Sequence, residues 1–99
     1  MNITIKDTTY RLRYTIRALF IYEQITGKVF SMNTITDEYL FFYCLLAANN
    51  PEIQLTFDEL IDECDTDMNL MLQFQGFLKK EMEKQQLFIT KQEDTKKKS

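Results

Sequence analysis

The stretch YLFFYCLLAANNP, residues 39–51, decides the fold, because ten consecutive apolar residues are followed by a strong stop signal. Its length and its Leu and Ala content predict a helix over 37–49. Pro51 ends this helix, since the residue before a proline disfavours the helical conformation. The helix is apolar on every side after Glu38, so we expect it to be the central, most buried element. The run is about half of the roughly 20 residues that span a bilayer, so no membrane contact is expected.

Threonines mark where helices begin. Thr56 and Glu59 match a capping box, in which each side chain binds a free amide of the other residue. The central helix is capped either by Thr34 with Asp37 or by Thr36 alone. The other three helices are expected at residues 16–26, 57–64 and about 65–86.

The segment RALFIYEQITGK, residues 17–28, predicts a helix that Thr15 begins and Gly27 closes, with apolar residues on two sides. One side carries Ala18, Ile21, Tyr22 and Ile25, and another carries Ile16 and Phe20. A helix that borders one small core needs a single apolar stripe. Either the central helix, the N-terminal hairpin and the last helix together surround this one, or part of it is left for another chain.

Apolar and polar residues alternate in Ile3–Lys6 and again in Tyr10–Tyr14, which predicts a short β-hairpin over 2–14 with its turn at Asp7-Thr8-Thr9. Two strands alone are marginal in water, so the hairpin must pack on a helix. The predicted fold is therefore mainly α, a small four-helix domain over 1–89 with an N-terminal β-hairpin. Residues 90–99 are too polar to order themselves and predict a disordered charged tail.

The chemistry of the chain argues against an enzyme. It has no His, and its two cysteines, Cys44 and Cys64, sit in apolar helical patterns, which favours free buried thiols. Asp65–Asn69 resembles the start of a calcium loop, but Leu70 and Gly76 stand where such a loop needs Gly and Glu. A helix cap at Thr66 or Asp67 explains the same residues. We predict no catalytic residue, no metal and no cofactor.

Charge is segregated along the chain. Residues 37–67 hold nine acidic and no basic side chains, whereas 68–99 hold seven basic against four acidic ones. The acidic middle either lies near Arg11, Arg13, Arg17 or the last helix, or forms a surface that docks a basic partner. The net charge of −3 disfavours binding to nucleic acid.

Because no catalytic or metal site is predicted, we looked for apolar surfaces that could bind another polypeptide, and the sequence offers two. The surplus apolar side of the helix at 16–26 is one candidate, and the triplet Leu87-Phe88-Ile89 before the tail is the other. The triplet is either a last core contact or an anchor for a partner helix or a second copy of this chain. The predicted partner-binding residues are Ile16, Phe20, Tyr22, Leu87, Phe88 and Ile89.

Residues 10–65 resemble the tail assembly chaperones of long-tailed bacteriophages. The likeness is carried by Arg17, Ala18, Leu19, Glu23, Thr26, Gly27 and Lys28, and by Thr56, Asp58, Glu59 and Leu60. The resemblance implies a non-enzymatic protein of the bacterial cytoplasm that coats helices of the tape-measure protein and recruits tail-tube subunits.

Two alternatives stay open beside the chaperone. One is a small structural or adaptor protein of a phage or mobile-element assembly, and the other is an acidic inhibitor that mimics nucleic acid. Gene neighbourhood separates the first from the chaperone, and binding at varied salt tests the second.

Overall fold

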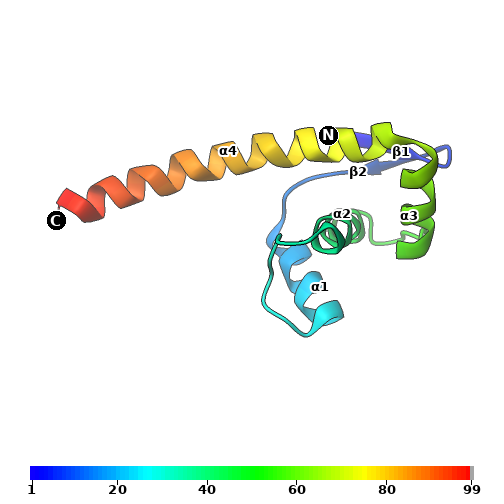
Figure 1. Ribbon diagram of the computed structural model, residues 1–99, viewed down its shortest axis with the longest axis horizontal. Coiled ribbons are helices and arrows are strands. Elements are labelled where there is room, and N and C mark those ends of the chain that lie inside the picture. Colours follow the sequence, from blue (N-terminus) through cyan, green and yellow to red (C-terminus); the bar gives the residue numbers. More distant parts are fainter. Residues whose placement is uncertain (99) are drawn as a thin grey trace.

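Helix α2 (Ile35–Asn49) runs through the centre of the fold, and the other elements pack around it (Figure 1). The computed structural model describes the backbone of residues 1–98 and the side chains of residues 1–84. The remaining elements are β1 (Asn2–Ile5), β2 (Thr8–Arg11), α1 (Ile16–Thr26), α3 (Phe57–Thr66) and α4 (Met68–Lys98). The mainly α fold with an N-terminal hairpin is therefore confirmed.

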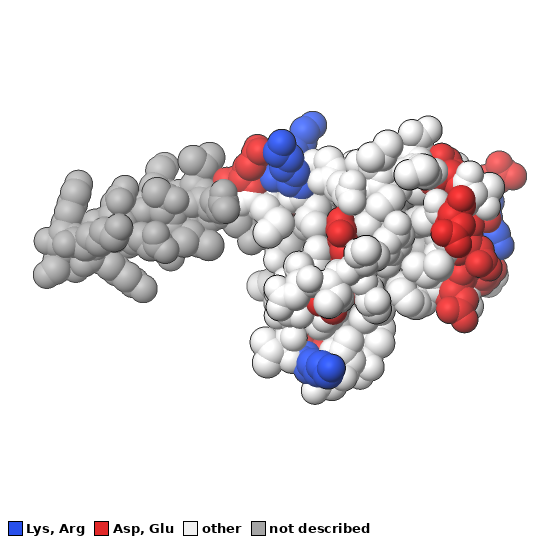
Figure 2. Space-filling model, viewed as in Figure 1, with Lys and Arg blue, Asp and Glu red and all other residues white. Residues whose placement is uncertain are grey.

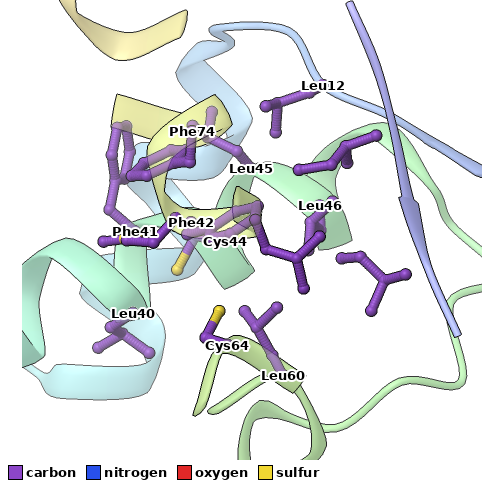
Figure 3. Close-up of a cluster of buried hydrophobic side chains, with 14 of the residues drawn as sticks. Leu12, Leu40, Phe41, Phe42, Cys44, Leu45, Leu46, Leu60, Cys64 and Phe74 are labelled. Carbon is purple, nitrogen blue, oxygen red and sulfur yellow. The ribbon is translucent and has the colours of Figure 1, made fainter. Parts of the chain in front are cut away.

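The core forms where α2 meets α3, α4 and the hairpin. Phe42 of α2 stacks on Phe74 of α4, with ring centroids 4.5 Å apart and an interplanar angle of 4°. Leu60 and Cys64 of α3 lie on the same cluster, as Figure 3 shows. No polar or charged residue is buried among the described side chains, so packing of apolar surface holds these elements together.

The two strands pair antiparallel, with Ile5 opposite Thr8, which leaves a two-residue turn at Lys6 and Asp7. Both turn residues have positive φ, 52° and 64°, as a hairpin turn of this length requires. The predicted turn at Asp7-Thr8-Thr9 is wrong by about one residue, because Thr8 and Thr9 already belong to β2. The alternation did place Ile3 and Ile5 on the buried side of the ribbon.

The helix starts agree closely with the capping signals. Thr34 and Asp37 form a complete capping box at α2, which decides between the two predicted starts, and Thr56 and Glu59 form the other at α3. Thr15 occupies the N-cap position of α1, but its side chain makes no capping hydrogen bond. That part of the prediction is wrong.

The end of α4 differs from the expected one. The helix was predicted to stop near residue 86 and give way to a disordered tail at 90–99, but its backbone is helical to Lys98. Neither Gly nor Pro follows Gly76, and the Lys, Glu and Gln residues beyond it favour helix. The C-terminal half of α4 extends away from the other elements (Figure 1). Over the residues that the structure describes, each helix is too short or too polar to cross a bilayer.

Candidate protein-binding surface

Helix α1 exposes one of its two apolar sides. Ile16 is 65% exposed and Phe20 is 58% exposed, and the two lie one turn apart on the same side of the helix. The opposite side carries Ala18, which is fully buried against α2. Figure 2 shows mainly uncharged surface over this part of the molecule, with a basic cluster at its lower end. The sequence left open whether other elements surround α1 or leave part of it uncovered. In the structure, part of its apolar surface is uncovered.

A hydrogen-bonded clip holds α1 and the linker that follows it. The Tyr22 hydroxyl donates to Asp37 Oδ1 over 2.8 Å. The Ser31 hydroxyl and the backbone amides of Asn33 and Thr34 donate to Asp37 Oδ2, each over 3.1 Å. These donors lower the pKa of Asp37, with the Tyr22 hydroxyl as the largest cause. The clip ties α1, the linker and the start of α2 into one unit, so the exposed face of α1 is presented in a fixed orientation.

The structure corrects one residue of the predicted partner-binding set. Tyr22 is only 2% exposed, because its ring packs edge-on against Phe30 and its hydroxyl is bound by Asp37. It belongs to the core and is not available to a partner. Ile16 and Phe20 are both exposed. The side chains of Leu87, Phe88 and Ile89 lie outside the described residues.

Further apolar side chains that the sequence reasoning missed are exposed near α1 and on α4. They are Ile25, Val29, Ile35, Met68, Leu72 and Met82. Val29 lies in the linker between α1 and α2, and Ile35 is the first residue of α2, where isolated apolar residues give no periodic signal. Leu72 lies outside the stripe Leu70–Phe74–Leu78 at helical spacing, so this position could have been recognised as exposed.

The acidic residues of α3 gather at one end of the molecule, on the right in Figure 2. Among the described side chains, Glu59 is the residue of this group that forms an ion pair, with Lys6 Nζ at 3.2 Å from its Oε2. Arg11, Arg13 and Arg17 form no ion pair with it. The acidic middle therefore does not pair with these arginines among the described side chains, but α3 packs against the last helix, α4, as the same alternative allowed. Most of the acidic side chains of α3 face solvent.

The described residues hold no arrangement typical of an active site. Cys44 and Cys64 are free and buried, and burial raises their thiol pKa values to about 12 and about 11, which suppresses the reactive thiolate. No group of three potential metal ligands occurs in this part of the chain. At the predicted calcium-like segment, Asp67 Oδ1 accepts the Asn69 amide at 3.0 Å, so Asp67 caps α4.

A hollow of about 570 Å³ lies between β2 and the loop over 49–54. Its lining mixes polar and apolar side chains and contains one carboxylate, Glu52, so it offers no pair of carboxylates for acid–base catalysis. Comparison of the chain with protein-family models, with curated proteins and with solved structures gave no match.

Proposed function

We propose that this protein is a non-enzymatic assembly chaperone that binds an amphipathic helix of another protein on the exposed face of α1. The observation that carries the proposal is the pair Ile16 and Phe20, two large apolar side chains left in solvent one turn apart. An amphipathic helix docks by placing its own apolar side chains, spaced three and four residues apart, against such a face.

The rigid attachment of the exposed face of α1 supports a role in binding a partner helix. A rigid partner surface loses less conformational entropy on binding than a flexible one. The clip around Asp37 fixes α1 on α2 before any partner arrives. The resemblance of residues 10–65 to phage tail assembly chaperones suggests the partner, a helical segment of a tape-measure protein, with tail-tube subunits as a second one. On this proposal the protein works in the cytoplasm of a bacterial host.

The experiment is a co-expression pull-down against the products of the neighbouring genes, a tape-measure fragment first. Phe20→Asp should abolish capture of the fragment, because a carboxylate cannot enter an apolar contact without a large desolvation cost. The matched control is Ile25→Asp. Ile25 is 52% exposed on the same helix but lies about 140° around the axis from Phe20.

Capture of the fragment by Ile25→Asp, together with loss of capture by Phe20→Asp, supports the exposed face of α1 as the binding site. Equal loss in both variants, or unchanged capture in both, contradicts it. A melt followed by circular dichroism should be nearly unchanged for Phe20→Asp, since this side chain is not part of the core.

A second candidate function rests on the acidic end of α3. Its carboxylates, apart from Glu59, have no ion pair among the described residues, so a basic protein could dock there, as an inhibitor that mimics nucleic acid would require. Binding of a basic nucleic-acid-binding protein at low salt that is lost at high salt would favour this alternative. Absence of binding at low salt removes it.

A further inference from the structure

The outer edge of β2 presents peptide groups that the hairpin itself does not use. The Leu12 amide donates to the Met1 carbonyl over 2.8 Å, and the Met1 amine donates to the Leu12 carbonyl over 3.2 Å. In an antiparallel ribbon every second residue forms such a pair with the other strand, and the residues between them point their amide and carbonyl outward. Counted back from Leu12, the outward residues of β2 are Arg11 and Thr9.

Two side-chain amides cover part of this edge. Asn50 Oδ1 accepts the Arg11 amide over 3.0 Å, and Asn50 Nδ2 donates to the Arg11 carbonyl over 2.9 Å. Asn49 Nδ2 donates to the carbonyl of Arg13, the next outward residue, over 2.8 Å. A carboxamide carries the same kind of donor and acceptor as a peptide group. The edge is therefore already paired with amides in the way that a neighbouring strand would pair with it.

Thr9 is the outward residue of β2 that this cover does not reach. Its hydroxyl lies 3.2 Å from the Thr4 hydroxyl, so its side chain is engaged across the ribbon. Its backbone amide and carbonyl form no hydrogen bond with the loop beside β2 in the part of the chain that the structure describes. An amide and a carbonyl left free on a strand edge are the groups to which an added strand binds.

The hollow of about 570 Å³ lies beside Thr9. Strand β2 forms one wall of the hollow, and the loop that contains Ile53 and Gln54 forms the other. Over the described residues, the backbone amide and carbonyl of Gln54 have no hydrogen bond either. The volume falls within the range of about 300–1,000 Å³ that is typical of ligand sites. The open edge of β2 thus borders a space that a short extended chain can fill.

We propose that the outer edge of β2 binds a short extended segment of another polypeptide, which pairs with Thr9 and fills this hollow. One residue of the segment donates its amide to the Thr9 carbonyl and accepts the Thr9 amide, as Asn50 does for Arg11. The two flanking side chains point to the side of the ribbon that carries Tyr10, because side chains alternate along a strand. Tyr10 and Ile53 are half-buried apolar residues of the lining, so both flanking side chains are apolar.

A second copy of this chain fits the hollow less well than a single segment does. Its β2 is paired with its own β1, so it would bring a ribbon two strands wide to a space that the loop over 49–54 bounds on the far side. A single segment adds one strand, about 4.8 Å of width. The site goes beyond the proposed chaperone function, because it uses β2 and leaves the exposed face of α1 free.

Nuclear magnetic resonance on the full chain tests the site. The probe is the peptide acetyl-Lys-Val-Thr-Val-Lys-amide, whose central threonine should lie opposite Thr9 and whose charged ends oppose a shift of register. Its titration should move the Thr9 and Gln54 amide signals and slow the exchange of the Thr9 amide with solvent. The same peptide N-methylated at its threonine should bind about tenfold more weakly, because the donor to the Thr9 carbonyl is lost.

Two proline variants give a matched comparison. Thr9→Pro removes the outward amide and should weaken binding of the probe by about tenfold, followed through the Gln54 signal. Thr4→Pro is the control, because Thr4 lies opposite Thr9 in the register and its amide points to the other edge of the ribbon. This control should bind the probe as the unmodified protein does. Thermal melts check that both variants keep the fold, and the N-methylated peptide decides the case without any substitution.

A Thr9 amide that does not move up to the solubility limit of the probe, equal affinity for the N-methylated peptide, or equal weakening by the two prolines would overturn the proposal. Movement of the Thr9 amide with protein concentration alone would also overturn it, because a second copy would then occupy the edge. The pull-down with α1 variants concerns a different element, so failure of one proposal is distinguishable from failure of the other.

Discussion

The Tyr22 hydroxyl donates a hydrogen bond to Asp37 Oδ1 over 2.8 Å and thereby joins α1 to the first turn of α2. The same carboxylate completes the capping box with Thr34 and binds Ser31 and Asn33 of the linker. One side chain thus ends the linker, begins the central helix and anchors α1. The orientation of the exposed face of α1 depends on it.

This bond predicts a pH dependence. Because the folded-state pKa of Asp37 is depressed, its contribution to stability is present above the ordinary value of about 3.9 and is lost as the pH falls through the lower folded value. Tyr22→Phe removes the largest cause of the depression. We expect the variant to melt at a lower temperature than the unmodified protein at pH 7, with a smaller difference at pH 3.

The control is Tyr43→Phe, which removes a hydroxyl that donates to the Leu55 carbonyl over 2.9 Å. A peptide carbonyl does not titrate in this range, so this variant should be destabilised equally at the two pH values. An equal pH dependence in both variants would contradict the role given to Asp37. Thermal melts followed by circular dichroism at pH 7 and pH 3 supply the comparison.

The hairpin turn predicts a stabilising substitution. Asp7 has φ of 64°, a left-handed conformation that costs most side chains about 1–2 kcal/mol, although Asp tolerates it better than others. Asp7→Gly should raise the free energy of unfolding by up to about 1 kcal/mol, since glycine suits this turn. Asp7→Val should lower it by about 1–2 kcal/mol, because a β-branched residue is strained there. Urea unfolding measures the free energy of unfolding of both variants. A change of the same sign in the two would contradict the explanation based on the left-handed conformation of residue 7.

The two glycines predict opposite responses to alanine. Gly76→Ala should stabilise the monomer by about 1 kcal/mol, because the site is helical and open. Gly27→Ala should destabilise it by about 1 kcal/mol, because Gly27 closes α1 with φ of 68°. Urea unfolding of both variants measures these changes. A loss of stability on Gly76→Ala would show that the helix is not open at this position.

Asn50 joins the hairpin to the end of α2. Its Oδ1 accepts the Arg11 amide over 3.0 Å, and its Nδ2 donates to the Arg11 and Leu46 carbonyls over 2.9 and 2.8 Å. The side chain thus pairs with the outer edge of β2 as a strand would. Asn50→Ala should lower the free energy of unfolding by about 1–3 kcal/mol, from the loss of these bonds.

The Asn50→Asp variant refines this test, because it keeps the acceptor for the Arg11 amide but loses the donor. It should be no more stable than Asn50→Ala in urea unfolding at pH 7, because its second carboxylate oxygen takes the place of Nδ2 against the Arg11 and Leu46 carbonyl oxygens. A variant Glu52→Ala, an exposed change in the same loop, should be near neutral. Stability of Asn50→Ala equal to that of Glu52→Ala would mean that the pairing contributes nothing.

Local signals explain why much of the fold could be predicted. The capping boxes at Thr34 and Thr56 and the glycine after α1 involve residues that are close together in sequence. The sequence alone therefore predicts them. The hairpin turn was misplaced because Lys6 carries no turn signal, although its φ is positive. The bonds of Asn50 to Arg11 join residues 39 apart in sequence, and no local pattern reports such a contact.

The candidate surface was predicted only in part. Ile16 and Phe20 fall on the exposed side of α1 because the helical period separates them from Ala18. Tyr22 lies on the side of Ala18, so periodicity already argued for its burial, and its partner Asp37 is distant in sequence. The exposure of Leu72 depends on which side of α4 meets α2, and the stripe through Phe74 indicates that side.

Helix α1 has α2 as its main neighbour, whereas α2 is enclosed by several elements. Opening of α1 to solvent should therefore need less free energy than global unfolding. The amides of α1 should take up deuterium earlier than those of α2. A ligand seated on Ile16 and Phe20 would act against that opening. Slower isotope uptake confined to residues 16–26 would then report occupancy of the face, without any label on the partner.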